Sequence, residues 1–126
     1  MEQVTLLEQR EAVKLDSNRL EELFLLLGEA SAEDVVCRAL EELAARLSHT
    51  ERCYRELRFD DMRKSARSLI AIAEQIGMQM LANVAQDVTR CIDHGDGTAL
   101  SATLSRLLRV GECSLSEIWD LQDLTI

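Results

Sequence analysis

The sequence predicts an all-α fold, an antiparallel up-down bundle of four long helices with a short additional helix at its N-terminal end. Apolar residues recur at the helical period of about 3.6 residues, and no alternating run reaches the length of a strand. Proline is absent, and hydrophobic residues make up 47% of the 126 residues although aromatic residues make up only 3%. An aliphatic core is typical of packed helices, and short connections favour antiparallel neighbours.

The first helix of the bundle follows a polar N-terminal extension. We expect the extension, residues 1–13, either to form a short helix or to fray, and residues 14–126 to form the bundle. Asp16 is a suitable N-cap for the first firm helix, and Gly28 is a natural stop. The face that this helix turns toward the core comprises Leu20, Phe24 and Leu27.

The second helix is the longest segment of regular apolar spacing. Ser31 is placed to cap it, and the apolar repeat continues to Leu57, which predicts a helix of about 25 residues. Thr50 is the one polar residue in the apolar seam. The other residues of the seam are Val36, Leu40, Leu43, Leu47 and Tyr54.

Three further helices complete the predicted bundle. The third helix begins at Asp60 or Asp61, either of which can cap it, and ends at Gly77. Its predicted core face is Met62, Ala66, Leu69, Ala73 and Ile76.

The fourth helix has an apolar face and stops within residues 93–97. That face comprises Leu81, Val84, Ala85, Val88 and Ile92. The fifth uses Leu100, Leu104, Leu107, Leu108, Leu115, Ile118 and Trp119. Gly111 in this last run either permits a close helix contact or breaks the helix.

Composition excludes several classes of partner. A net charge of −9 argues against nucleic acid, because phosphate backbones are bound by basic surfaces. No stretch approaches the roughly 20 apolar residues of a membrane span, and the first residues do not resemble a signal peptide. The four cysteines show no C-x-x-C pairing, which favours reduced thiols in a cytoplasmic protein and gives no metal-ligand spacing. We therefore expect no nucleic acid, membrane, metal or cofactor.

A motif in the third helix relates the chain to a known family. Arg67 is followed at regular intervals by Leu69, Ala73, Gly77 and Leu81. This skeleton, the long helix before it and the acidic turn at its entry resemble the histidine phosphotransfer (HPt) domain family over roughly residues 14 to 122. The resemblance implies a four-helix bundle in which a His projects from the middle of one helix. In the family, that His exchanges a phosphoryl group with an aspartate of a receiver domain.

Three positions depart from the family pattern. Arg67 replaces the phospho-accepting His, Ile70 replaces the Lys that helps to neutralise the phosphate, and Ala71 replaces the small Gly that admits the receiver. A guanidinium has a pKa above about 12 and stays protonated, so it offers no nucleophilic nitrogen. The resemblance therefore implies a phosphorelay scaffold that does not transfer phosphate, and we do not expect an enzyme.

The departures suggest a docking role for Arg67. Helical geometry turns this side chain about 130–140° away from the core face. Residues 51–67 hold six cations and four acids, a net charge of +2. By the resemblance, the partner is a response-regulator receiver domain or a histidine kinase, and a receiver's acidic cluster could pair with an arginine. The candidate binding residues are Arg67, Arg63, Lys64, Ile70, Ala71 and Glu74. The alternative is that Arg67 is an ordinary solvated arginine.

Two other functions stay open. His49 and His94 are the only histidines, and we expect both on the surface, His49 opposite the core face of its helix and His94 in a glycine-rich turn. A phosphorelay protein phosphorylated at one of them is the first alternative. The second is a bundle whose exposed strips mediate adaptor contacts or self-association into a homo-oligomer, without a link to signalling.

Overall fold

The structure of the protein is a computed structural model that describes the backbone of residues 17–124 and the side chains of residues 18–118. Its helices are α2 (Ser17–Leu27), α3 (Glu29–Arg55), α4 (Phe59–Gln75), α5 (Gln79–His94) and α6 (Gly97–Leu124). This part of the chain contains no strand, which confirms the all-α class, and none of its helices is long and apolar enough to cross a bilayer. The predictions for residues 1–13, Asp16 and Trp119 lie outside the described residues.

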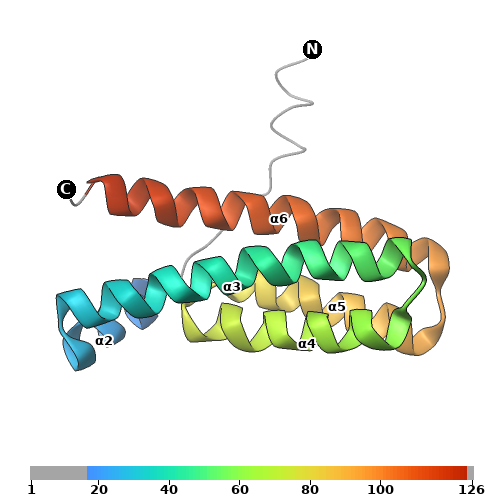
Figure 1. The fold of residues 1–126 in the computed structure, drawn as a ribbon, viewed down its shortest axis with the longest axis horizontal. Coiled ribbons are helices and arrows are strands. Elements are labelled where there is room, and N and C mark those ends of the chain that lie inside the picture. The colour runs from blue at the N-terminus through green and yellow to red at the C-terminus, as the bar shows by residue number, and fades with distance from the viewer. Residues whose placement is uncertain (1–16, 125–126) are drawn as a thin grey trace, which may run out of the picture.

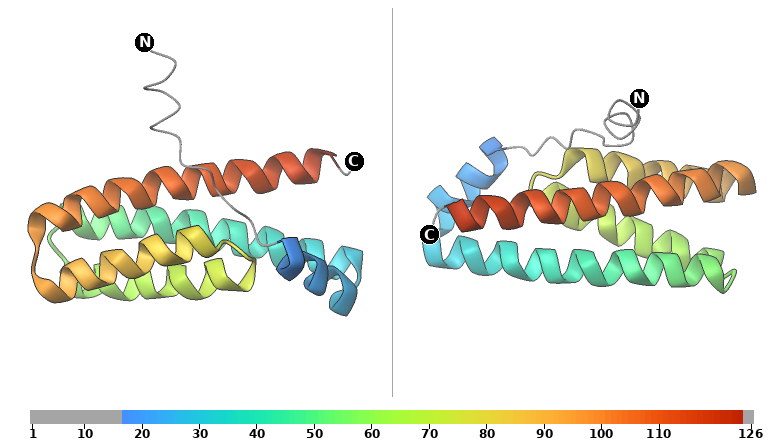
Figure 2. Two further views of the ribbon diagram at one scale, coloured as in Figure 1. Left: turned by 180° about the vertical axis from the view of Figure 1, so that it is seen from behind. Right: turned by 90° about the horizontal axis from the view of Figure 1, so that it is seen from above.

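Helices α3 to α6 lie lengthwise beside one another, and each runs opposite to the one before it (Figure 1). Each packs against the next along the chain, and α6 also contacts α3. The short α2 packs on α3 at the end where α3 begins, as Figures 1 and 2 both show. With 27 and 28 residues, α3 and α6 are longer than α4 and α5, which have 17 and 16. The first turns of α3 therefore extend past α4 and carry α2.

The core is aliphatic, as the composition predicts. The predicted face of α4 is fully enclosed, with 0% exposure at Met62, Ala66, Leu69, Ala73 and Ile76. Both α3 and α5 pack against α4. In the other helices, the predicted core residues that are buried are Val36, Leu40, Leu43, Leu47, Leu81, Val84, Ala85, Val88, Leu100, Leu104, Leu107 and Ile118. Tyr54, Ile92, Leu108 and Leu115 are partly buried against the same core.

A pair of buried hydroxyl groups joins α3 to α4. Thr50 Oγ1 lies 2.7 Å from the carbonyl oxygen of Arg46 and 2.7 Å from Ser65 Oγ, and Ser65 Oγ lies 3.2 Å from the same carbonyl. Each hydroxyl has one proton to donate, so only two of these three contacts can be hydrogen bonds at one time. The two contacts of 2.7 Å are favoured over the one of 3.2 Å. Because both side chains are buried, this polar contact fixes the register of α4 against α3.

Gly111 permits a close helix contact and does not break α6. The helix continues through it to Leu124. A Cβ atom at Gly111 would lie 2.6 Å from Cδ1 of the buried Leu47, closer than two carbon atoms can approach without movement. The absence of a side chain at this position therefore lets α6 approach α3.

The predicted cap of α3 is wrong. The helix begins at Glu29, directly after Gly28, and Ser31 lies within its first turn. Gly28 has φ of 79°, a conformation that favours glycine, and it reverses the chain within one residue. Few linker residues are then needed between α2 and α3, so the helix resumes before Ser31.

The predicted cap of α4 is wrong as well. The helix begins at Phe59, with Arg58 at the N-cap position, and Asp60 and Asp61 lie in the first turn. There the two carboxylates face the positive end of the helix dipole. Asp61 also accepts a hydrogen bond of 2.8 Å from Arg58, so the acidic turn stabilises the start of α4 without capping it.

The predicted core position of Leu57 is a further error. Helix α3 ends at Arg55, and Leu57 has φ of 59° with a side chain that is 71% exposed. The Arg58 N–H donates to the Cys53 carbonyl at 2.8 Å, the bond of a Schellman motif, which places Leu57 where glycine is usual. Gly77 occupies the corresponding position after α4. The last buried residue of α3 is Cys53 instead, with Tyr54 partly buried beside it.

Helix α2 is covered less than its sequence predicts. Leu23 is buried and Leu20 is partly buried. Phe24 and Leu27, which were expected on the core face, are 39% and 45% exposed. The reason is that, among the helices that the structure describes, α2 packs mainly on α3, which leaves its other sides less covered.

Replacing Leu57 by glycine is expected to stabilise the protein. Glycine removes a left-handed strain of about 1–2 kcal/mol, and its greater freedom in the unfolded chain offsets part of this gain. We expect the free energy of unfolding, measured by urea denaturation, to rise by about 0.5–1 kcal/mol. The control Leu57→Ala keeps the Cβ atom and should give no such gain. An equal gain in both variants would show that side-chain exposure, and not backbone strain, sets the effect.

Candidate functional site in the groove between α4 and α5

The outer face of α4 presents a row of residues at helical spacing. Arg63, Arg67 and Ala71 follow one another at intervals of four, and Ile70 and Glu74 extend the row. Because the opposite face of α4 is enclosed in the core, this row points away from it. Arg67, Ala71 and Glu74 are exposed, and Ile70 is half-buried. The exposure predicted for Arg67 is therefore found.

Helix α5 supplies the opposite wall of an open groove. One side of this helix faces the row on α4 across a volume of about 500 Å³ and presents Gln86, Thr89 and Arg90. The Thr89 hydroxyl donates to the Gln86 carbonyl at 2.7 Å, so it is already bonded within its own helix. We call this space the α4–α5 groove.

Arg63 crosses from α4 to α5 and binds Asp93. Its Nε lies 2.8 Å from Oδ1 and its Nη2 lies 3.3 Å from Oδ2, a bidentate arrangement. The hydrogen bond from Arg63 lowers the pKa of Asp93, and the charges of His94 and Arg67 lower it further. The same hydrogen bond raises the pKa of Arg63. Since both side chains remain partly exposed, the pair is screened by solvent, and its main consequence is to occupy the Arg63 guanidinium.

Arg67 is the guanidinium in the groove that has no ion pair or hydrogen bond with the side chains that the structure describes. Arg90 Nη1 lies 3.4 Å from Asp87 Oδ1. The arginines of the groove are Arg63, Arg67 and Arg90, and the acids beside them are Glu74, Asp87 and Asp93, so three positive charges face three negative ones. The formal charges at the groove are therefore balanced, and Arg67 is the guanidinium that has no ion pair among the described side chains.

The structure brings together five of the six predicted binding residues. Lys64 is exposed but does not line the groove. Sequence reasoning missed the contribution of α5, namely Gln86, Thr89 and Arg90. The available signal was a polar row on the outer side of that helix, continued by Asp93. That signal could not be used without knowing which side of the helix meets α4.

Neither histidine lines the groove. His49 is half-buried, which corrects the expected exposure, and its Nε2 lies 3.5 Å from Cys53 Sγ. His94 is exposed, as predicted. Its Nδ1 lies 2.8 Å from the carbonyl oxygen of Arg90 and must donate to it, so in the neutral ring the lone pair is on Nε2.

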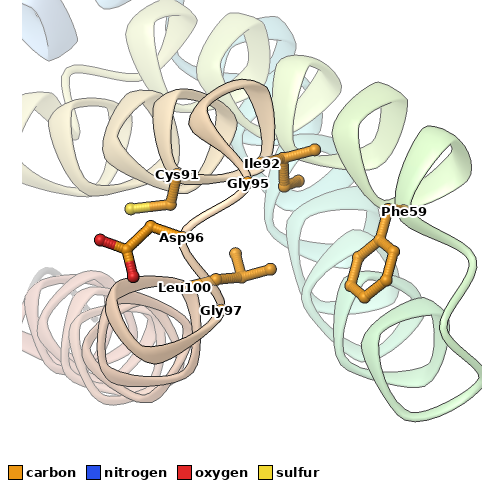
Figure 3. A pocket seen from close by; sticks show the side chains of 7 residues that line it. All are labelled: Phe59, Cys91, Ile92, Gly95, Asp96, Gly97 and Leu100. Carbon is orange, nitrogen blue, oxygen red and sulfur yellow. The ribbon is translucent and has the colours of Figure 1, made fainter.

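A second, smaller hollow of about 170 Å³ lies where the α5–α6 turn faces the start of α4 (Figure 3). Its apolar walls include Phe59, Ile92 and Leu100. Asp96 also borders it, but its Oδ1 accepts the Ala99 N–H at 3.1 Å and caps α6. Cys91 Sγ lies 3.6 Å from Thr103 Oγ1. Among the described residues no group of His, Cys, Asp or Glu could hold a metal, and the four cysteines are free thiols.

The α4–α5 groove combines charged, small and apolar side chains. Arg67 offers hydrogen-bond donors, Ala71 leaves space beside it, and Ile70 offers apolar contact. The lining holds no imidazole that could accept a phosphoryl group or act as a base. Comparisons of the chain with family models, curated proteins and solved structures find no match.

Asp93→Asn is expected to remove a pH-dependent part of the stability. The pKa of Asp93 is lower in the folded than in the unfolded chain. Ionised Asp93 therefore contributes to the free energy of unfolding above its unfolded pKa of about 3.9, and this contribution is lost as the pH falls through its folded pKa. The stability difference between wild type and Asp93→Asn should stay constant from about pH 7 to 5 and shrink below about pH 4. Urea unfolding across this range measures it.

The control for this experiment is Arg63→Gln, alone and combined with Asp93→Asn. Asp61, whose pKa the hydrogen bond from Arg58 lowers, titrates in the same window but contributes equally to every variant. When Arg63 is replaced by Gln, the free energy of unfolding should still differ between the chains with and without Asp93→Asn, but this difference should depend much less on pH. A difference that does not change with pH in the wild-type background would mean that the pair does not form in solution.

Proposed function

We propose that this chain is a non-catalytic HPt-like protein of two-component phosphorelay signalling. In this proposal it is a cytoplasmic, up-down four-helix bundle with a short helix at its start, and it binds a receiver domain or a histidine kinase without transferring phosphate. The observation that carries the proposal is Arg67, an exposed and unpaired guanidinium at the position where the resemblance places the phospho-accepting His. The alternating directions of α3 to α6 agree with such a bundle.

The chemistry of the groove favours an acidic partner site. A guanidinium presents donors in a planar fork that matches a carboxylate, and a receiver of the implied kind offers a cluster of carboxylates. Arg63 and Arg90 are held by Asp93 and Asp87, so recognition of the partner falls on Arg67. Ala71 is exposed one turn further along α4 and leaves room for a close approach.

Phosphorylation at His94 is the second candidate function. His94 is exposed, and the hydrogen bond of its Nδ1 to Arg90 leaves Nε2 with the lone pair that would attack a phosphoryl group. His49 is less suitable, because its Nε2 lies against Cys53 Sγ in a half-buried position. The two candidates differ in whether label from a phosphorylated partner appears on this chain.

Arg67→Ala is expected to weaken binding to the receiver or kinase partner by about 10- to 100-fold. A hydrogen bond to a charged group contributes about 1.5–3 kcal/mol, and its loss is felt directly in the dissociation constant. Arg67→Glu should weaken binding further, since it places like charges together. The measurement is calorimetric titration against the receiver domains and histidine kinases of the source organism.

The matched control is Arg109→Ala, which removes an exposed cation on α6, outside the groove. It should bind like the wild type. If Arg67→Ala also binds like the wild type, the role of Arg67 is wrong. Acid-labile label on the wild-type chain after incubation with a phosphorylated partner would contradict the non-catalytic proposal, and its loss in His94→Gln would assign the second candidate.

The variant Arg67→His/Ile70→Lys/Ala71→Gly is expected to gain phosphoryl acceptance. It places an imidazole, an ammonium and a glycine where the resemblance requires them, on positions that are exposed or half-buried. The measurement is acid-labile label after incubation with a phosphorylated receiver, with His94→Gln added to exclude that side chain. The variant Ile70→Lys/Ala71→Gly, which keeps Arg67, should take no label. A folded triple variant that no partner labels would count against an HPt-like scaffold.

A further inference from the structure

The last turn of α2 carries exposed apolar side chains on several sides. Leu25 and Leu26 are 85% and 78% exposed, and Phe24 and Leu27 are 39% and 45% exposed. Because successive residues turn by about 100° around a helix, these four side chains surround it. A helix that is apolar all round is normally enclosed, yet α2 packs mainly on α3. We call these four residues the α2 apolar end, and a patch of this kind marks an interaction site.

Exposed acidic side chains are concentrated on both sides of the α2 apolar end along the chain. Glu21 and Glu22 lie one turn before Leu25 and Leu26 on the same helix, and both are exposed. The first turns of α3 add the exposed Glu29, Glu33 and Asp34. Arg19 is the one cation within residues 17–34, and its Nη1 lies 3.3 Å from Glu22 Oε2. With five acids and one cation, residues 17–34 have a formal charge of −4.

We propose that the α2 apolar end is a docking site for a basic amphipathic helix of another protein. Such a helix presents large apolar residues at intervals of three and four, flanked by Lys and Arg, and it complements both the leucines and the acids around them. A second copy of this chain would bring five further acids against the same five, and an anionic membrane would be repelled for the same reason. The site shares no residue with the α4–α5 groove, so it does not depend on the function proposed above.

The probe for this site is a fluorescent 18-residue peptide of leucine and lysine, with the leucines on one helical face. We expect it to bind the full chain, and the Leu25→Gln/Leu26→Gln variant to bind at least about tenfold more weakly, since two large apolar contacts are lost. Glutamine forms helices about as well as leucine, so α2 should persist, which circular dichroism checks. Glu21→Gln/Glu22→Gln should also weaken binding and reduce its dependence on salt.

Two controls separate this site from general attraction between charges. A peptide of the same composition, with its leucines spread around the helix, should bind at least tenfold more weakly. The variant Leu57→Gln alters another exposed leucine, at the opposite end of α3, and should bind like the wild type. Equal binding of the two peptides, or an equal loss in Leu57→Gln and in the double variant, would overturn the proposal.

The remaining outcomes identify other occupants and also overturn it. Concentration-dependent dimers in sedimentation that Leu25→Gln/Leu26→Gln abolishes would assign the patch to a second copy. Peptide binding that appears only after residues 1–13 are removed would assign it to the chain's own N-terminal segment. Co-sedimentation with vesicles of anionic lipid that the same variant abolishes would assign it to a membrane surface.

Discussion

The arrangement of the candidate site depends on how α4 is rotated about its own axis. Its buried face, which includes Leu69 and Ala73, has no exposed area, and α3 and α5 both pack against the helix. Turning α4 by one residue, about 100°, would take this face out of the core and bring charged side chains into it, which is costly. The rotation is therefore fixed, and a fixed rotation places Arg67 outside and toward α5. The position of this one side chain follows from the packing of the opposite face of its own helix.

Small and hydroxyl-bearing side chains define the helix contacts in a core that has few aromatic residues. The Thr50–Ser65 contact between α3 and α4 forms in one register, and Thr50 also bonds to the Arg46 carbonyl within its own helix. Aliphatic side chains alone tolerate several registers. The close approach of Gly111 to Leu47 constrains α6 against α3 in a similar way. These contacts are specific because a shift along the helix would separate Thr50 from Ser65 and Gly111 from Leu47.

The helices and the core faces of α3 to α6 could largely be predicted from the sequence because both are local properties, set by spacing along one segment. The errors at the helix caps and at Leu57 arose where geometry depends on the turn, whereas Phe24 and Leu27 were misplaced because their exposure depends on which helices pack against α2. Gly28 and Leu57 both adopt positive φ, and this moved the start of α3 and took Leu57 out of the core. The site was predicted on α4 only, since its other wall requires the packing of α5. The pairing of Arg63 with Asp93, 30 residues apart, was likewise beyond any local pattern, although it occupies one of the predicted binding residues.

The distribution of charge gives the two proposed surfaces opposite responses to salt. The chain has a net charge of −9, so an acidic partner of the α4–α5 groove is repelled at long range and attracted only at short range by Arg67. Added salt screens the long-range repulsion, and the association rate of such a partner should rise. A basic helix at the α2 apolar end is attracted at long range by the net negative charge and at short range by the nearby acids. Added salt screens this attraction and should slow its association. A chain that cannot transfer phosphate through Arg67 could still distinguish an acidic partner from a basic one in this way. Both partners meet the same net charge of the chain, but the local charge differs between the two surfaces.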